Sequence, residues 1–288
     1  MEELTVSNVM STPVYVVMPD EPLSRARNLM LKHRVNRLVV VDERTMPLGM
    51  ITQADILNHL SQPDAPWRRR PVDSIPVRNA MSDGLIRMHG KATLQEAVEV
   101  MLENNIRGVP VVGEGLEGII TLTDITRYIG KLDPDVLVCD VMADFVVSVH
   151  TQQSVPHVIE KMQENEVEIV VVKEAGYPVG MISSTNLALL ELTELMEGII
   201  KSKEPRMVRK EMHDGRMRYR YIKETHLVAE DIMNRTMVVV SSNDRIGRAC
   251  ELMVGEGLQA IPTIDEHNEL CGVVSDEGIA SILMTEGN

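Results

Sequence analysis

The sequence is poor in aromatic residues and in cysteine. Aromatic side chains make up only 2% of the 288 residues although 44% are hydrophobic, so the core must be built from Val, Ile, Leu and the 20 methionines. Three scattered cysteines, Cys139, Cys250 and Cys271, show no close spacing. A disulfide framework and a cysteine metal or redox site are therefore not expected, and a reducing, intracellular compartment fits best.

Several functional signals are also missing. The chain has no basic-then-apolar leader and no apolar run of membrane-spanning length, so we expect a cytoplasmic protein without membrane contact. There is no Walker loop and no nucleophile elbow, and the 8 histidines are spread singly without ligand-like spacing. We therefore expect no catalytic residues, no metal site and no enzyme activity.

Charge is unevenly distributed. The formal net charge is -14, which argues against a surface that binds nucleic acid throughout. Between Lys201 and Lys223, however, nine basic residues face three acidic ones, which gives +6 there and -14 - 6 = -20 elsewhere. This segment poses a separate functional question.

What the sequence does contain is a fourfold internal repeat. Each copy opens on a similar segment: Val6-Ser-Asn-Val-Met10, Val77-Arg-Asn-Ala-Met81, Val138-Cys-Asp-Val-Met142 and Val228-Ala-Glu-Asp-Ile-Met233. Each then reaches a glycine-led strand that runs into a helix: Gly49-Met-Ile-Thr52-Gln-Ala-Asp55, Gly118-Ile-Ile-Thr121-Leu-Thr-Asp124, Gly180-Met-Ile-Ser183-Ser-Thr-Asn186 and Gly272-Val-Val-Ser275-Asp-Glu-Gly278. The repeat is the unit of folding.

The second copy shows the order of elements most clearly. Thr93-Leu-Gln-Glu96 is a capping box, and the apolar residues after it predict a helix over 94–104. Two short strands, 108–112 and 116–121, follow, and Asp124 enters a second helix. The order strand, helix, strand, strand, helix predicts an α/β (α+β) unit with a small sheet covered by two helices. Units of about sixty residues have marginal cores, so pairing is expected.

Two segments depart from the repeat. Residues 63–76, rich in proline and arginine, read as a linker. Between the third and fourth copies, 198–227 form a basic insert, in which Arg216-Met-Arg-Tyr-Arg-Tyr221 after Asp214-Gly215 predicts a hairpin. Its candidate contacts for nucleic acid or a protein partner are Arg206, Arg209, Lys210, Arg216, Arg218, Tyr219 and Arg220. The alternative is a solvated hairpin that packs its Met and Tyr face on the protein.

The strand-to-helix junctions combine a hydroxyl with an acid. A Thr hydroxyl and the N-H groups of a helix start suit a phosphate, while a carboxylate can accept hydrogen bonds from a ribose diol. A single Thr-x-x-Asp is usually an ordinary helix cap, but it recurs at the same place in two successive copies. A ribose monophosphate presents both groups that such a junction would bind.

On these openings, junctions and element order, the chain resembles a tandem array of four cystathionine-beta-synthase (CBS) domains. The resemblance implies domains at 1–62, 77–132, 136–197 and 228–288, called repeats 1 to 4 below, paired through their sheets into two modules that bind adenosine ligands between their members. The number of domains also resembles the gamma subunit of AMP-activated protein kinase.

The resemblance implies which residues bind the nucleotide. Thr52 with Asp55, and Thr121 with Asp124, keep the full phosphate and ribose pattern. Asn36, Arg37 and Arg107 would approach the phosphate, and Thr12, Val14 and Leu85 would line the adenine. Ser183 with Asn186, and Ser275 with Gly278, keep only part of the pattern, so binding is expected to be weaker there.

Three functions remain open at this stage. The leading hypothesis is a non-catalytic sensor that binds AMP, ADP or ATP, needs no other cofactor and signals to an unknown effector protein. A related version binds S-adenosylmethionine, although Arg37 and Arg107 favour an anionic ligand. The others are a nucleic-acid-binding protein that acts through residues 201–223, and a structural scaffold with empty clefts. Whether two chains form a homodimer is left open.

Overall fold

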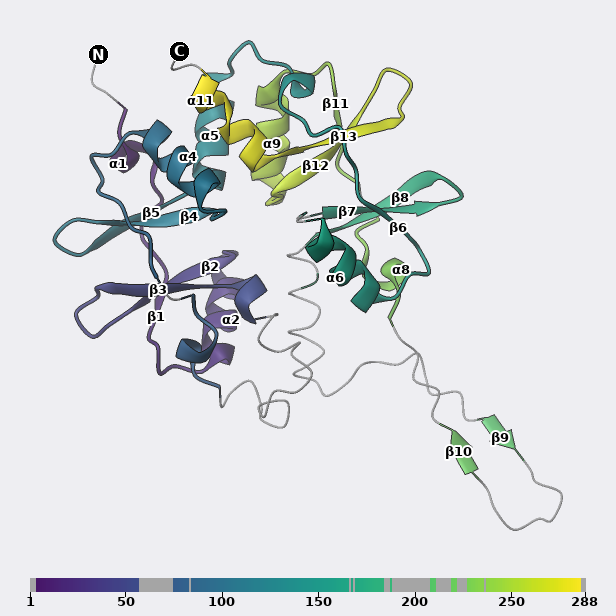
Figure 1. Cartoon of the computed structure of the whole chain (residues 1–288), viewed down its shortest axis with the longest axis horizontal. Coiled ribbons are helices and arrows are strands. Elements are labelled where there is room, and N and C mark those ends of the chain that lie inside the picture. Colours follow the sequence, from purple (N-terminus) through teal and green to yellow (C-terminus); the bar gives the residue numbers. More distant parts are fainter. Residues whose placement is uncertain are drawn as a thin grey trace. The chain divides into compact units, whose positions relative to one another are not determined.

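The computed structural model describes residues 4–56, 75–82, 84–165, 167, 169–183, 187, 208–210, 219–221, 227–235 and 237–285. The chain divides into two compact units (Figure 1). Unit 1 comprises Met1–Val146 with Thr236–Asn288, and therefore holds repeats 1, 2 and most of repeat 4. Unit 2, Val147–Arg235, holds most of repeat 3, the insert and the opening of repeat 4.

Repeat 1 forms a three-stranded sheet beside a helix. Its elements are α1 (Val6–Val9), β1 (Val16–Val17), α2 (Leu23–His33), β2 (Arg37–Val41) and β3 (Pro47–Thr52). The strand order is β1-β2-β3, with β1 parallel and β3 antiparallel to β2. Thr52 pairs with Arg37 in this register, so the end of β3 lies beside the start of β2.

Repeat 2 follows the same plan with a two-stranded sheet. It contains η3 (Val77–Asn79), α4 (Leu94–Glu103), β4 (Gly108–Val112), β5 (Leu116–Thr121) and α5 (Leu122–Leu132). The predicted capping box starts α4: the Thr93 hydroxyl accepts from the Glu96 amide at 3.1 Å, and the Glu96 carboxylate accepts from the Thr93 amide at 2.8 Å. Both orphan donors at this helix start are therefore satisfied.

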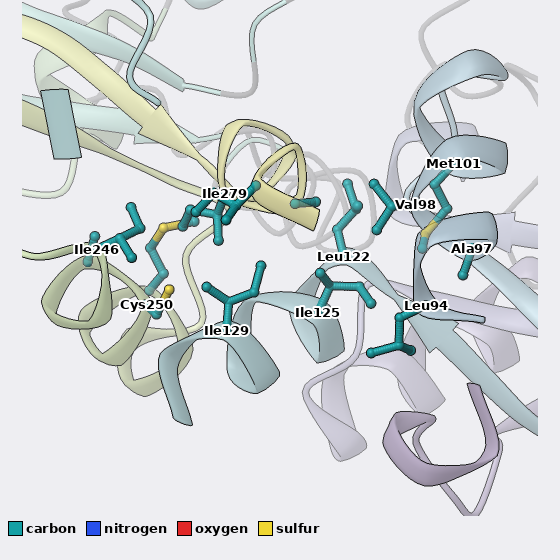
Figure 2. Packing of buried hydrophobic residues seen from close by; sticks show 14 of the residues in the cluster. Leu94, Ala97, Val98, Met101, Leu122, Ile125, Ile129, Ile246, Cys250 and Ile279 are labelled. Atoms are coloured by element: carbon teal, nitrogen blue, oxygen red, sulfur yellow. The ribbon is translucent and has the colours of Figure 1, made fainter. Parts of the chain in front are cut away.

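Repeat 4 packs beside repeat 2 within unit 1. Its elements there are β11 (Val240–Ser241), α9 (Ile246–Glu256), β12 (Ala260–Ile264), β13 (Leu270–Ser275), α10 (Asp276–Ala280) and α11 (Ile282–Thr285), and η4 (Val138–Asp140) of repeat 3 joins them. Side chains from α4, α5, α9 and α10 form one hydrophobic core (Figure 2). In it, Ile125 and Ile129 of α5 lie in the same buried cluster as Ile246 and Cys250 of α9.

Unit 2 has a smaller core. Its sheet has the order β6-β7-β8, and the elements are β6 (Ser148–His150), α6 (Val155–Glu164), β7 (Ile169–Glu174), β8 (Tyr177–Ser183) and α8 (Ala229–Ile232). The insert contributes an antiparallel pair, β9 (Val208–Lys210) with β10 (Tyr219–Tyr221). The pair includes Tyr219–Tyr221 of the predicted hairpin, whereas residues 211–218, with the Asp214-Gly215 turn, lie outside the described residues.

Each repeat places its opening segment in the core of its pair partner. The amide of Val6 donates to Ala92 of repeat 2, and the amide of Val77 donates to Glu21 of repeat 1, both at 2.8 Å. In the same way the opening of repeat 3 hydrogen-bonds repeat 4, and that of repeat 4 hydrogen-bonds repeat 3 through the Ala229 amide. Since Val6, Val77 and Ala229 are fully buried there, a single repeat cannot complete its core alone.

The predicted α/β fold of four repeats is confirmed, with differences at segment ends. Helix α4 ends at Glu103 rather than at residue 104. Ile75, within the predicted linker 63–76, is 2% exposed and accepts a hydrogen bond from the Leu23 amide. The end of that segment therefore belongs to the exchanged opening of repeat 2. Two of the methionines expected as core filler, Met30 and Met101, are each 1% exposed.

Candidate functional site

The junction between β5 and α5 holds a compact hydroxyl and carboxylate network. Thr121 ends the strand and caps the helix: its hydroxyl accepts from the Asp124 amide at 3.2 Å. One oxygen of the Asp124 carboxylate accepts in return from the Thr121 hydroxyl at 2.6 Å and from the Thr121 amide at 3.0 Å. The capping geometry fixes Asp124, which is 2% exposed.

Two further donors complete the hydrogen bonding of the Asp124 carboxylate. Its second oxygen accepts from the Ser11 hydroxyl at 2.7 Å and from Arg127 Nη1 at 2.8 Å. Ser11 lies just after the exchanged opening of repeat 1, and its backbone pairs with Ile119 of β5. Exchange of opening segments therefore brings repeat 1 directly onto the acid of repeat 2. All four lone-pair positions of the carboxylate are used.

A cavity of about 390 Å³ lies beside this network and is lined by three repeats. Repeat 1 contributes residues 11–15, 34–37 and 39, repeat 2 contributes 107, 119, 121, 123, 124 and 127, and repeat 4 contributes 257–259 and 276. The predicted residues Thr12, Val14, Asn36, Arg37, Arg107, Thr121 and Asp124 all line it. The structure thus brings seven of the expected residues to one place, from repeats that are distant in sequence.

Arg37 reaches from repeat 1 toward the junction of repeat 2. A Cβ atom added to Gly108 would lie 3.1 Å from Arg37 Nη1 and 3.1 Å from Thr121 Cγ2. Gly108 pairs with Thr121 in the sheet, just as Arg37 pairs with Thr52 in repeat 1. The absence of a side chain at Gly108 therefore gives the guanidinium access to the start of α5, where an anion would be favoured.

The cavity lining is cationic in an acidic protein. It carries four arginines, Arg34, Arg37, Arg107 and Arg127, against two aspartates, Asp124 and Asp276, a formal charge of 4 - 2 = +2. The whole chain carries -14. A cavity of this charge attracts an anionic ligand.

Arg107 is held by acids of repeat 4. Its Nη1 donates to Glu277 Oε1 at 2.8 Å, and its Nη2 contacts Asp276 Oδ1. Burial raises the pKa of Asp276 to about 6, although Arg107 and Arg37 act to lower it. Arg107, which was predicted to contact the phosphate, is therefore ion-paired with repeat 4 in this structure.

The equivalent junction in repeat 1 has the same local geometry. The Asp55 carboxylate accepts from the Thr52 hydroxyl at 2.7 Å and from its amide at 2.8 Å. Burial raises the pKa of Asp55, while Thr52 and the charge of Arg37 act to lower it. Thr52 and Asp55 do not line the cavity described above, and neither does the predicted adenine-side residue Leu85. These three residues remain predictions for a second site.

Repeats 3 and 4 depart from the pattern. Ser183 ends β8, whereas Asn186 lies outside the described residues. Ser275 caps α10 by accepting from the Gly278 amide at 3.1 Å. A Cβ at Gly278 would lie 2.6 Å from the carbonyl oxygen of Val141, so an aspartate at this position would collide with backbone. The weaker binding expected at this junction stays a prediction.

The lining residues that were not singled out from the sequence include Tyr15, Arg34, Gln259 and Asp276. Tyr15 stacks on His33 at a centroid distance of 3.9 Å, next to the predicted adenine-side residues. Tyrosine is rare in this chain, which has only five, and this rarity could have drawn attention to Tyr15. Gln259 and Asp276 could not be found by comparing repeats 1 and 2, because they enter the cavity from repeat 4.

The remaining predicted contacts lie elsewhere. Arg209, Lys210, Tyr219 and Arg220 belong to β9 and β10, whereas Arg206, Arg216 and Arg218 fall outside the described residues. Within the described ranges, no group of three His, Cys, Asp or Glu residues could hold a metal ion. No helix in that part of the chain has both the length and the apolar character that a membrane span requires.

Comparison with known proteins defines the class. The family model of the CBS domain matches residues 6–62, 77–131, 138–191 and 228–285. The chain therefore belongs to the CBS domain family and carries four copies of the domain, as the sequence motifs predicted.

Individual relatives agree with this class. The uncharacterized protein MJ1404 of Methanocaldococcus jannaschii is 36% identical over 140 residues, which cover 46% of this chain but only 33% of that protein. Protein MJ1225 of the same organism is 24% identical over 278 residues, covering 92% and 94% of the two chains.

Solved structures show the same fold. The crystal structure of MJ1225, described as a proposed archaeal homolog of g-AMPK, covers 97% of this chain and 99% of its own, with a TM-score of 0.79 and 21% identity. An uncharacterized conserved protein from Pyrococcus horikoshii covers 97% and 100%, with a TM-score of 0.63 and 16% identity. These likenesses establish the four-repeat fold.

Proposed function

We propose that this chain is a non-catalytic regulatory protein that binds an adenosine nucleotide, AMP, ADP or ATP, in the cavity between repeats 1, 2 and 4 and signals its occupancy to a partner protein. The observation that carries the proposal is the cavity itself. It places a fixed carboxylate, a cationic lining and a helix start within one volume of about 390 Å³.

The carboxylate of Asp124 is the proposed ribose contact. Because its four acceptor positions are used by Thr121, Ser11 and Arg127, a ribose hydroxyl binds by exchange rather than by addition. Arg127 is the donor that can leave, since its side chain is 44% exposed and can be rehydrated. The Thr121 bonds are part of the helix cap and stay in place.

The phosphate is proposed to lie between Arg37 and the start of α5. Arg37 Nη1 already lies close to Gly108 and Thr121, and the positive end of the eleven-residue helix α5 begins there. Charge-assisted bonds from a guanidinium to phosphate are strong, and they are stronger in a partly enclosed cavity. The net +2 of the lining favours a phosphate over the cationic sulfonium of S-adenosylmethionine.

Calorimetric titration with AMP, ADP, ATP and S-adenosylmethionine tests the proposal. Asp124→Asn should weaken the preferred nucleotide about tenfold to a hundredfold, because charge-assisted hydrogen bonds worth roughly 1.5–3 kcal/mol are lost. Glu96→Gln is the matched control: it alters a hydroxyl-acid cap of the same kind on α4, exposed and away from the cavity. Its affinity should equal that of the unmodified chain.

Two outcomes count against the proposal. If none of the four ligands binds, the function itself is wrong. If a nucleotide binds but neither Asp124→Asn nor Asp55→Asn changes its affinity, the assignment of the ribose contact is wrong.

A further inference from the structure

An ion pair between repeats 2 and 4 forms part of the cavity wall. Arg107, whose side chain is 13% exposed, contacts Asp276, 3% exposed, and Glu277, 43% exposed. Asp276 is the first residue of α10 and lines the cavity, and its amide donates to the Gln259 carbonyl at 3.0 Å. The acid is therefore fixed by the backbone of repeat 4 and points at an arginine of repeat 2.

This ion pair gives the cavity two regions of different formal charge. Around Arg107, one positive charge meets two carboxylates, a formal 1 - 2 = -1. Around Arg37 and the start of α5, Arg37 and Arg127 stand against Asp124, a formal 2 - 1 = +1. The two regions line the same cavity of about 390 Å³. A second or third phosphate on a nucleotide bound at Arg37 would therefore add its charge within reach of Asp276.

We propose that Asp276, supported by Glu277, is a specificity-determining residue that limits the anionic charge of the bound ligand and makes the cavity prefer a nucleoside monophosphate over a triphosphate. The inference rests on the proposed nucleotide binding and refines it. Asp276 neutralises Arg107, so that this arginine does not attract further phosphates, and its own carboxylate repels them. Its burial keeps that repulsion poorly screened by salt.

The repeat pattern explains how this acid arises. In repeats 1 and 2 the acid stands three positions after the junction hydroxyl, whereas in repeat 4 it stands one and two positions after Ser275. Gly278 takes the third position, where the Val141 carbonyl leaves no room for a side chain. The fourth repeat thus has no acid of the ribose-binding type and instead directs its acids to Arg107 of the second.

The test compares AMP with ATP at pH 7.5 without divalent cations, so that the full phosphate charge is present. Asp276→Asn should raise the affinity for ATP about tenfold relative to AMP, and Glu277→Gln should act in the same direction with a smaller effect. Glu269→Gln is the control, because it removes one negative charge from an exposed position of repeat 4 that does not line the cavity. It should leave the AMP to ATP ratio within twofold.

The outcomes separate this inference from the proposed function. If the unmodified chain binds AMP but Asp276→Asn and Glu277→Gln leave the ratio unchanged, Asp276 is only a structural ion-pair residue and the inference fails alone. A change that weakens both nucleotides alike leads to the same conclusion. If Asp276→Asn does not fold, the half-exposed Glu277→Gln decides the matter. If the unmodified chain binds no nucleotide, the proposed function fails, and this inference fails with it.

Discussion

The close crossing of α5 and α9 makes a prediction that can be worked out from one contact. A Cβ atom at Gly130 would lie 2.8 Å from the Cβ of Cys250, about 1 Å inside ordinary carbon contact. Both atoms are attached directly to helix backbone, so neither can rotate away. Gly130→Ala must therefore push apart the two helices that hold repeats 2 and 4 together.

The expected cost follows by comparison with a second helical glycine. Replacing glycine by alanine within a helix normally stabilises by about 1 kcal/mol. Gly255→Ala in α9, where a Cβ would meet nothing within 4 Å, should show this gain. Overpacking costs about 1–3 kcal/mol, so Gly130→Ala should be less stable than Gly255→Ala by roughly that amount.

Urea unfolding of both variants measures the difference. The double variant Gly130→Ala with Cys250→Gly removes the opposing Cβ, so the two changes should be non-additive and the double variant more stable than their sum predicts. Equal stability of Gly130→Ala and Gly255→Ala, together with additive effects in the double variant, would show that the helices do not cross this closely.

Two further predictions concern buried ionisable groups. Because the pKa of Asp276 is raised from 3.8 to about 6, protonated Asp276 stabilises the fold below pH 3.8, and this contribution is lost as the pH rises through 6. Relative to Asp276→Asn, the free energy of unfolding of the chain should fall by up to about 3 kcal/mol between pH 4 and 7.5 in unfolding titrations. A difference between the two proteins that does not change with pH would contradict this prediction. Burial raises the pKa of the Cys250 thiol to about 12, whereas Cys139 is exposed. A thiol reagent should therefore modify Cys139 rapidly and Cys250 only on unfolding. Rapid labelling of Cys250 in the folded chain would contradict its burial in the core.

Much of the fold was predictable because local signals agree with the tertiary structure. The strands 108–112 and 116–121 match the prediction, since each carries one apolar pattern and the turn between them contains glycine. The exchange of opening segments was not predictable. Val6 and Val77 occupy similar sequence positions, and the residues around them do not indicate that each completes the core of another repeat.

The cavity was predictable only where the repeats follow their shared pattern. Asp124 and Thr121 were identified because the same motif occurs twice, and Arg37 because the resemblance to CBS domains implies a phosphate contact there. Asp276 was missed since its place in the cavity lining depends on α10 lying against repeat 2, a contact between segments far apart in the chain. The absence of a side chain at Gly278 was visible in the sequence, but its cause, the nearby carbonyl oxygen of Val141, is visible only in the structure.

A crystal structure of the chain grown with excess AMP tests the central claim most directly. We predict the nucleotide in the cavity between repeats 1, 2 and 4, with a ribose hydroxyl within about 3.2 Å of the Asp124 carboxylate and the phosphate beside Arg37. An unfilled cavity, with Asp124 still bonded to Ser11 and Arg127 and the nucleotide absent or bound elsewhere, would contradict it.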